Sequence, residues 1–297
     1  MTIDFKDKVA IVTGAGGGLG RSHALELSKR GAKVVVNDLG GSVDGSGGSS
    51  EAAEKVVKEI ISSGGQAISN GSSVTDDKGV KLMIDQTINE YGKIDILINN
   101  AGILIDKSFS KMEINDFEKV LNVHLLGSVK PTKAVWEIMK EQNYGRIIVT
   151  SSSSGLYGNF GQTNYGAAKL GLVGFMNTLK LEGQKYNVHV NALTPVAYTR
   201  MTANLMPPEA ENLLTPESVT PAAIYLVSDE APNGIILCAG AGVYSVSKIM
   251  ESDGLSLGLN ATAEDIVNNW KKISNFNEAK SYNMGGEQTG KVFEKAM

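Results

Sequence analysis

Tyr165 and Lys169 have the residue types and the spacing needed for acid–base chemistry. Residues four apart share one face of a helix, so the lysine ammonium can lie near the phenol oxygen and lower the high pKa of the tyrosine toward neutral pH. Such a tyrosine acts as general base when an alcohol is oxidised and as general acid when a ketone is reduced. A serine in the run Ser151 to Ser154, which follows a predicted strand, can donate a hydrogen bond to the substrate oxygen.

A glycine-rich turn near the N-terminus predicts a phosphate site. Gly14, Gly18 and Gly20, with Leu19 among them, lie between an apolar strand and an amphipathic helix. Glycines let the backbone approach a pyrophosphate, and the free N–H groups and positive end of the helix attract the anion. The place of this turn, between the first strand and the first helix, is the context that a dinucleotide-binding motif requires.

Asp38 ends the second predicted strand, roughly twenty residues after the glycines. A carboxylate in that place can accept hydrogen bonds from both ribose hydroxyl groups and would repel a 2′-phosphate. Gly17, just before Gly18, offers no cation to hold such a phosphate. The loop therefore favours NAD over NADP, although Arg21 is a nearby cation that weakens this preference.

The elements that position these residues form an alternating pattern of short apolar strands and longer helical segments. Strands of continuous apolar sequence are buried on both faces, and long helical connections between them make crossovers, so the pattern predicts an α/β fold with a doubly wound parallel sheet of Rossmann type. With 297 residues the chain is long enough for one such domain and a C-terminal extension. The predicted strands are Val9–Thr13, Val34–Asn37, Ile94–Asn99, Arg146–Thr150 and Val188–Thr194.

Several motifs in order, from about Phe5 to Gly242, resemble the short-chain dehydrogenase/reductase family. They are the glycine turn, the run Asn99-Asn100-Ala101-Gly102, and Tyr165-x-x-x-Lys169 with Ser152 thirteen residues upstream. The resemblance implies that Ser152 and Tyr165 bind the substrate oxygen, and that Lys169 also hydrogen-bonds the nicotinamide ribose. It implies cofactor contacts from the following residues as well: Gly14, Gly18, Leu19, Gly20, Asp38, Ser73, Val74, Asn100, Tyr165, Lys169 and Thr199.

The chain departs from the family pattern at three positions. His124 stands where the family commonly has an asparagine that completes a proton relay. It could carry protons itself, serve only through its backbone carbonyl, or be structural. Val196 replaces the usual glycine after Pro195, which affects backbone contacts to the nicotinamide amide, although Thr199 could still reach that group. Ser73 replaces an aspartate that often touches adenine.

More specific stretches resemble the dehydrogenase units of type 2 peroxisomal multifunctional enzymes, where histidine is usual at the relay position. These stretches are VNDLGG, NNAGIL, VHLLGSVK, GLYGNFGQTNYGAAKLGLVGF and NNWKKISNF. The resemblance implies NAD-dependent oxidation of (3R)-3-hydroxyacyl-CoA in fatty-acid β-oxidation, a peroxisomal location, and a homodimer formed by helices 111–140 and 165–186. Pro131 is expected to kink the first of these helices. Hydratase or sterol-carrier domains follow such units in longer chains.

Composition excludes several other classes. A formal net charge of −4 gives no basic footprint for nucleic acid, and no apolar run is long enough to span a bilayer. Cys238 is the only cysteine and the three histidines are far apart, so no metal site and no internal disulfide are expected. The last three residues, Lys295-Ala296-Met297, are not a peroxisomal S-K-L signal. Without the resemblance, the expected location would be cytoplasmic.

Residues 1–245 are expected to form the dehydrogenase domain and residues 246–297 an extension. The segment AEDIVNNWKKI within the extension has helical spacing. The extension either packs on the domain as a cover for the active site or leads to downstream domains. Leu39 to Ser50, rich in Gly and Ser, is either a flexible linker or a loop that shapes the cofactor mouth.

Three rival functions share parts of this pattern. A 3-oxoacyl thioester reductase that uses NADPH is disfavoured by Asp38. A steroid or other secondary-alcohol dehydrogenase would share every catalytic residue, and only substrate profiling separates it. A non-catalytic NAD-binding module is disfavoured by the intact set of Ser152, Tyr165 and Lys169. Acyl chain length stays open because the loop from Thr202 to Leu214 varies freely within the fold.

Overall fold

The computed structural model describes residues 2–203 and 207–297. Contacts divide the chain into two compact units, which meet between Val246 and Ser247 and are described separately below. Part of the expected substrate loop, residues 204–206, lies outside the described residues. Within the described ranges no helix combines the length and apolar character needed to cross a bilayer.

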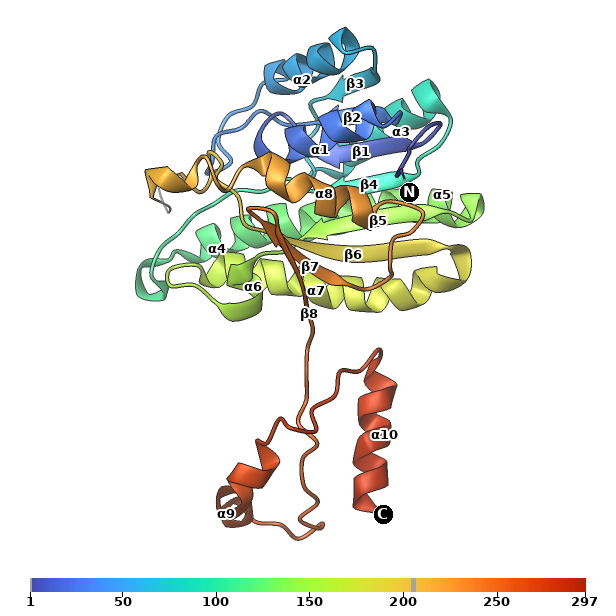
Figure 1. Ribbon diagram of the computed structural model, residues 1–297. Helices are drawn as coiled ribbons and strands as arrows, with labels where there is room; N and C mark the ends of the chain where they lie inside the picture. The colour runs from blue at the N-terminus through green and yellow to red at the C-terminus, as the bar shows by residue number, and fades with distance from the viewer. Residues whose placement is uncertain (1, 204–206) are drawn as a thin grey trace. The chain divides into compact units, whose positions relative to one another are not determined.

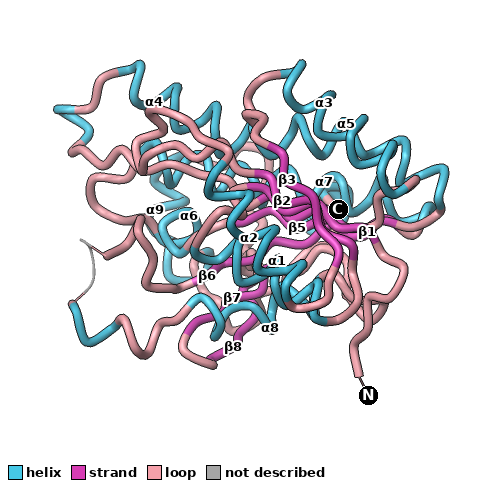
Figure 2. Tube along the Cα trace, turned by 90° about the horizontal axis from the view of Figure 1, so that it is seen from above, coloured by secondary structure: helices cyan, strands magenta, loops and turns pink. Residues whose placement is uncertain are grey.

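The first unit is built on one eight-stranded sheet with the order β3-β2-β1-β4-β5-β6-β7-β8 (Figures 1 and 2). Neighbouring strands from β3 to β7 pair in parallel, which confirms the predicted doubly wound fold. The order reverses between β1 and β4, and in such sheets ligands bind beyond the carboxyl ends of the strands at that point. The strands are β1 Val9–Thr13, β2 Lys33–Asn37, β3 Gln66–Asn70, β4 Ile96–Asn99, β5 Gly145–Thr150, β6 Val188–Pro195, β7 Ile236–Gly240 and β8 Val243–Ser247.

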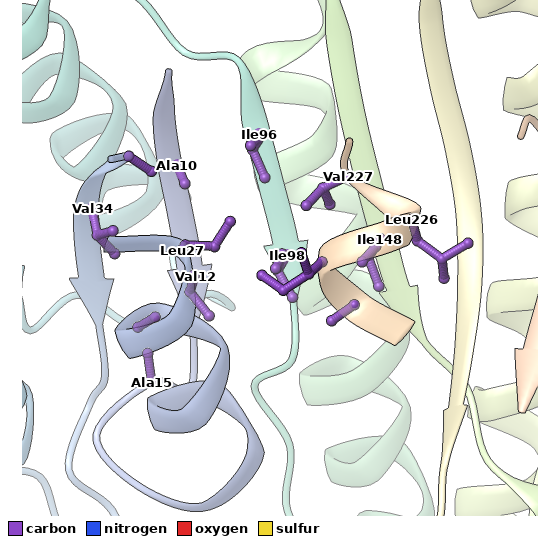
Figure 3. Packing of buried hydrophobic residues seen from close by; sticks show 14 of the residues in the cluster. Ala10, Val12, Ala15, Leu27, Val34, Ile96, Ile98, Ile148, Leu226 and Val227 are labelled. Atoms are coloured by element: carbon purple, nitrogen blue, oxygen red, sulfur yellow. The ribbon is translucent and has the colours of Figure 1, made fainter. Parts of the chain in front are cut away.

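Helices cover both faces of this sheet, and alternate residues of each strand enter different cores. Ala10 and Val12 of β1 belong to a core that includes Leu27 and Leu226 from the helices on one face (Figure 3). Ile11, between them, belongs to a second core on the other face. The side-chain period of two in a strand requires this division. Burying one such aliphatic side chain contributes roughly 1.5–3 kcal/mol, so both faces hold the strand ends in place.

The helices that enclose the first core are α1 Gly18–Lys29, α2 Glu51–Ser62 and α8 Pro216–Leu226. Those on the second core are α3 Asp77–Tyr91, α5 Gly127–Gln142 and α7 Thr163–Gly183. Shorter elements are α4 Ile114–Leu121, α6 Ser153–Tyr157 and the 3₁₀ turns Phe109–Lys111, Gln184–Tyr186 and Pro208–Ala210. The expected helix over 165–186 is thus present, shifted by two or three residues.

The helix expected over 111–140 is present from Ile114 to Gln142, but it is not regular throughout. A π-helical turn, Asn122–Leu126, lies between α4 and α5. Pro131 lies inside α5 and is buried there, and the interruption occurs upstream of it. A π turn places one extra residue in a helix and is frequent at functional sites. Here it contains His124.

The last two strands form a hairpin that the sequence pattern did not predict. Ala241 and Gly242 join β7 to β8, and both have positive φ, 50° and 74°. A two-residue loop with positive φ at both positions is the type I′ turn whose twist suits an antiparallel hairpin. Glycine accepts this conformation without strain, whereas Ala241 carries some steric cost.

The second unit, from Ser247 to Met297, contains two helices, α9 Ala263–Ile273 and α10 Gly285–Ala296. The helix expected for AEDIVNNWKKI is α9, and a capping box between Thr262 and Asp265 fixes its start. Lys291 joins α10 to Glu251 at 2.7 Å. A backbone bridge between Glu251 and Lys280 ties the connecting segments together.

Candidate active site

The predicted site residues come from the carboxyl ends of six strands, so the sheet brings them to one edge. Since β1 and β4 lie at the reversal of strand order, the glycine turn and Asn100 flank the crevice where a dinucleotide binds in this architecture. The residues that follow the strands are Gly14 after β1, Asp38 after β2, Ser73 and Val74 after β3, Asn100 after β4, Ser152 after β5 and Thr199 after β6.

The glycine turn requires glycine for two separate reasons. Gly14 and Gly18 have φ of 63° and 52°, a conformation that side chains disfavour. Gly20 is close to another part of the backbone, because a Cβ there would lie 2.3 Å from the carbonyl oxygen of Gly14. The Asn100 side chain stabilises this arrangement by donating to the carbonyls of Thr13 and Gly14 at 3.1 and 3.0 Å. The turn and the start of α1, with Leu19 in its first turn, are thereby held in one shape.

A methyl group at Gly20 is expected to damage this turn. Gly20→Ala should weaken nicotinamide nucleotide binding at least tenfold and lower the free energy of unfolding by roughly 1–3 kcal/mol, because the new Cβ overlaps backbone that cannot yield. Gly17→Ala is the matched control, since a Cβ at Gly17 meets nothing within 4 Å. Titration of cofactor fluorescence and urea unfolding of both variants measure the two effects. Equal behaviour of the two variants would contradict the close approach at Gly20.

Asp38 is held at the carboxyl end of β2 by two backbone donors. Its Oδ2 accepts the Gly16 N–H and its Oδ1 accepts the Gly40 N–H, both at 2.7 Å. An ionised carboxylate has about four acceptor positions, so both oxygens keep lone pairs for ribose hydroxyl groups. The nearby cation Arg21 pairs with Glu59 of α2 and is therefore already neutralised.

The Gly/Ser-rich segment Leu39 to Ser50 is tied to the rest of the site, which favours a loop at the cofactor mouth over a free linker. Its Val43 carbonyl accepts the Leu104 N–H at 2.9 Å, from the segment after β4. Its Gly41 carbonyl accepts from the Arg200 guanidinium at 3.2 Å, from the segment after β6. The segment thus joins the Asp38 end of the site to the parts that follow β4 and β6.

The remaining cofactor candidates occupy two places. Ser73 Oγ bonds the Thr75 hydroxyl at 2.9 Å and accepts the Thr75 N–H, which closes a tight turn after β3. Val74 in that turn is buried and would lie 2.7 Å from a Cβ at Gly127. Thr199 lies near Gly18, where an added Cβ would meet its methyl group at 3.5 Å. Thr199 therefore lies beside the glycine turn, as a cofactor contact requires.

Tyr165 and Ser152 are brought together by α7 and the end of β5. A side-chain hydrogen bond joins the two residues. Burial raises the pKa of Tyr165 to about 12; the Ser152 hydrogen bond opposes this rise and the charge of Asp106 adds to it. The expectation that Lys169 lowers the pKa of this phenol is not met in the protein alone, because withdrawal from water outweighs the other effects.

Lys169 lies in the same crevice but directs its ammonium elsewhere. It is only 3% exposed, its Nζ donates to the Thr150 carbonyl at 2.5 Å, and it lies 5.4 Å from the centre of the Tyr165 ring. Burial lowers its pKa from 10.5 to about 7. Near neutral pH the side chain can therefore release or accept a proton readily, which a surface lysine cannot.

His124 completes the set from the π-helical turn. Its ring meets that of Tyr165 edge to face, with centroids 5.0 Å apart, and its Nε2 lies 2.7 Å from the Ile103 carbonyl. Since a carbonyl only accepts, Nε2 carries the hydrogen, and Nδ1 is a buried acceptor with no partner among the described residues. Burial and the charge of Lys169 hold its pKa well below 6.5, so the ring is neutral. The His124 carbonyl accepts the Ser128 hydroxyl at 2.7 Å.

Gly102 has no side chain and so leaves the space that the His124 ring occupies. A Cβ on Gly102 would lie 2.3 Å from His124 Cε1, so the ring covers the bare backbone of that glycine. The Asn99-Asn100-Ala101-Gly102 run thus serves two ends of the site. Asn100 supports the glycine turn, and Gly102 makes room for His124.

Two side chains of the site were missed in the sequence, namely Asp106 and Gln162. Gln162 precedes α7 and donates to Asp106 Oδ2 at 2.7 Å. The pair is 56 residues apart in the chain, and no spacing rule links them. The one sign in the sequence is a glutamine directly before the catalytic helix, where a capping residue is expected.

The geometry fits a nicotinamide nucleotide. Gly14 and Gly20 hold the turn close to neighbouring backbone, a Cβ at Gly17 would meet nothing within 4 Å, and Asp38 keeps free lone pairs after its two backbone hydrogen bonds. Three buried polar atoms at this edge have no partner among the described residues: Asn99 Oδ1, His124 Nδ1 and Thr194 Oγ1. Buried polar atoms normally have partners in the protein or in ordered water, and His124 Nδ1 belongs to the ring that packs on Tyr165. No cluster of potential metal ligands occurs within the described residues.

Comparison with known proteins agrees with this geometry. A family model described as short chain dehydrogenase matches residues 8–210. A short-chain type dehydrogenase/reductase of Mycobacterium tuberculosis is 47% identical over 93% of this chain and 96% of its own length. Peroxisomal multifunctional enzyme A of Dictyostelium discoideum is 49% identical over 93% of this chain, but the match spans only 62% of that enzyme.

A solved structure extends the comparison through both units. Full-length peroxisomal multifunctional enzyme type 2 of Drosophila melanogaster superposes with a TM-score of 0.81 and 36% identity, over 98% of this chain and 50% of that one. The chain therefore spans about half of this structural relative. The family match, the sequence relatives and the site at the carboxyl edge of the sheet together assign this chain to the short-chain dehydrogenase family, whose members are oxidoreductases that use a nicotinamide nucleotide.

Proposed function

We propose that this chain is an NAD-dependent dehydrogenase that oxidises (3R)-3-hydroxyacyl-CoA to 3-oxoacyl-CoA in fatty-acid β-oxidation. Two observations together carry the proposal. The chain contains the Ser152, Tyr165 and Lys169 site, and it is similar over almost its whole length to peroxisomal multifunctional enzymes. The preference for NAD is supported by Asp38, whose carboxylate at the end of β2 keeps free lone pairs for ribose hydroxyl groups, and by the pairing of Arg21 with Glu59.

The proposed chemistry divides among four side chains. Ser152 donates to the substrate oxygen, and Tyr165 removes the proton of the C3 hydroxyl group as the C3 hydrogen leaves with its electron pair. NAD, held by the glycine turn, Asp38 and Lys169, would supply the acceptor for that hydride. Lys169 binds the nicotinamide ribose and, with a pKa near 7, relays the proton from Tyr165. His124 is the next group on this route, because its ring packs on Tyr165 and its Nδ1 is a buried acceptor with no partner among the described residues.

The other cofactor contacts follow from position. The N–H groups of the turn from Gly14 to Gly20 hold the pyrophosphate, Ser73 and Val74 border the adenine, and Asn100 and Thr199 border the nicotinamide end. These assignments are supported by the position of all these residues at the same carboxyl edge of the sheet.

The proposal includes the wider assembly. Apolar side chains on the helices expected at a twofold interface are exposed in the single chain, among them Ile114, Leu126 and Leu170 at 45–68%. A homodimer through these helices would cover them. Peroxisomal location, and hydratase or sterol-carrier domains in a longer chain, rest on the relatives named above, of which this chain spans only a part.

Absorbance at 340 nm with matched (3R)- and (3S)-hydroxyacyl-CoA of medium chain length tests the proposal. The expected result is NADH formation with the 3R isomer and NAD, at least tenfold faster than with NADP or with the 3S isomer. Faster turnover with NADP would favour a 3-oxoacyl thioester reductase. Silence on both isomers would contradict the proposed substrate and direct the test to steroids and other secondary alcohols.

A further inference from the structure

The segment that follows β4, residues 103–107, contacts a different part of the site at each residue. It passes between the cofactor loop, the π-helical turn and the start of α7. Hydrogen bonds to several neighbours hold the segment, and with it these parts of the site, in one arrangement. The contacts are Ile103 to His124 at 2.7 Å, Leu104 to Val43 at 2.9 Å, Ile105 to Asn164 at 3.0 Å, Asp106 to Gln162 at 2.7 Å and Lys107 to Gly161 at 3.0 Å.

Gln162 is the centre of the network on the catalytic side. It is 4% exposed, and its amide oxygen accepts two hydrogen bonds. Its Oε1 accepts from Ser154 Oγ at 2.7 Å and from Asn159 Nδ2 at 3.2 Å, and its Nε2 donates to Asp106. Because a carboxylate only accepts, Asp106 fixes which end of the amide faces it. Gln162 thereby joins the turn just after Ser152 to the start of the helix that carries Tyr165.

We propose that Asp106 and Gln162 form a positioning pair for Tyr165: Gln162 holds the Ser152 turn against the start of α7, and Asp106 locks the Gln162 amide and brings a negative charge into the network that holds this helix start. The proposal rests on the proposed function only in that Tyr165 is the acid–base group. Neither residue touches the reacting atoms, so both act through Tyr165.

The groups around Tyr165 leave Asp106 as the anion that affects it. Ser152 donates a hydrogen bond, His124 is neutral because it is buried, and Lys169, with its pKa lowered to about 7, is neutral in the range where Tyr165 titrates. Among the described residues, Asp106 is the charged group that raises the pKa of Tyr165, after burial. Burial also raises the pKa of Asp106, and the Gln162 hydrogen bond opposes that rise. The carboxylate therefore keeps Tyr165 protonated to higher pH, which suits a group that must also act as an acid.

Asp106→Asn tests the charge directly. Asparagine keeps the shape and an acceptor oxygen for Gln162, so it removes the charge alone. The pKa of Tyr165 should fall by about one unit, as expected for loss of a like-signed neighbour. It is read in the full cofactor-free chain by NMR titration of ¹³Cζ-labelled tyrosine, with the Tyr165 signal assigned by its loss in Tyr165→Phe. A structural role alone would leave this pKa unchanged.

Asp116→Asn is the matched control, because Asp116 pairs with Lys107 at 2.6 Å in the same segment without contacting Gln162. Its Tyr165 pKa should equal that of the unaltered chain. Asp106→Ser, which also removes the charge, serves if Asp106→Asn does not fold. An unchanged Tyr165 pKa in the folded Asp106 variant overturns the proposal. The titration needs no substrate. A chain that does not turn over hydroxyacyl-CoA would refute the proposed function, but the Tyr165 pKa would still test the positioning pair.

Discussion

Replacing Tyr165 with phenylalanine is expected to lower kcat for alcohol oxidation by roughly 10³-fold, within the range that a positioned acid–base group contributes. The ring packs edge to face on His124, and phenylalanine keeps that contact, so only the hydroxyl group is lost. Cofactor affinity should change less than threefold, because the glycine turn and Asp38 are untouched.

The measurement pairs absorbance at 340 nm with titration of cofactor fluorescence. Tyr91→Phe is the control, since Tyr91 ends α3 and packs against the second core, and it should keep near-normal turnover. Residual turnover above about one tenth in Tyr165→Phe would refute the role of this residue as general base.

Replacing Lys169 with methionine should have opposite effects on activity and stability. Burial lowers the pKa of Lys169 from 10.5 to about 7. Between these values the unfolded chain binds a proton that the folded chain does not, so the stability of the cofactor-free protein rises with pH across this window. Below pH 7 the buried ammonium imposes its full penalty. Lys169→Met removes the penalty and should raise the free energy of unfolding at pH 7 by on the order of 2 kcal/mol.

Turnover of the same variant should fall by roughly 10²-fold or more, because the proton route from Tyr165 is lost. Urea unfolding at pH 7 and pH 9 checks the stability effect, and the gain should be smaller at pH 9. Lys81→Met, on an exposed lysine of α3, should change stability by less than about 0.5 kcal/mol. A Lys169→Met protein that is less stable than the unaltered chain at pH 7 would show that the Thr150 hydrogen bond outweighs the cost of burial.

Most of the sheet could be predicted because its strands are buried on both faces. Continuous apolar runs such as Val9–Thr13 are stable only in the buried interior of a parallel sheet, and β1 begins and ends at those residues. The hairpin strand β8 escaped prediction because it is exposed and has no such run. Helix α10 escaped for the related reason that it is largely polar.

The π-helical turn shows where periodicity fails. Residues 111–140 keep an acceptable helical pattern, and one extra residue in a single turn leaves no mark on that pattern. The turn contains His124, whose ring packs over Gly102, and this tertiary contact cannot be read from the local helical pattern.

The candidate site divides in the same way. Residues that belong to local motifs, such as Gly20 and Lys169, could be identified from their spacing, because the same turn or helix sets both the spacing and the geometry. Asp106 and Gln162 were missed because only the fold brings them together. The acidity of Tyr165 was misjudged as well, since burial depends on everything around the ring and the four-residue spacing to Lys169 does not determine it.

The central claim is hydride transfer from C3 of a (3R)-hydroxyacyl-CoA to NAD at the Tyr165 site, and deuterium at C3 tests it most directly. With (3R)-[3-²H]-hydroxyacyl-CoA and NAD, the reduced cofactor should carry one deuterium by mass spectrometry, and Tyr165→Phe should form almost none. Reduced cofactor without deuterium, or equal labelling by the Tyr165→Phe protein, would contradict the account.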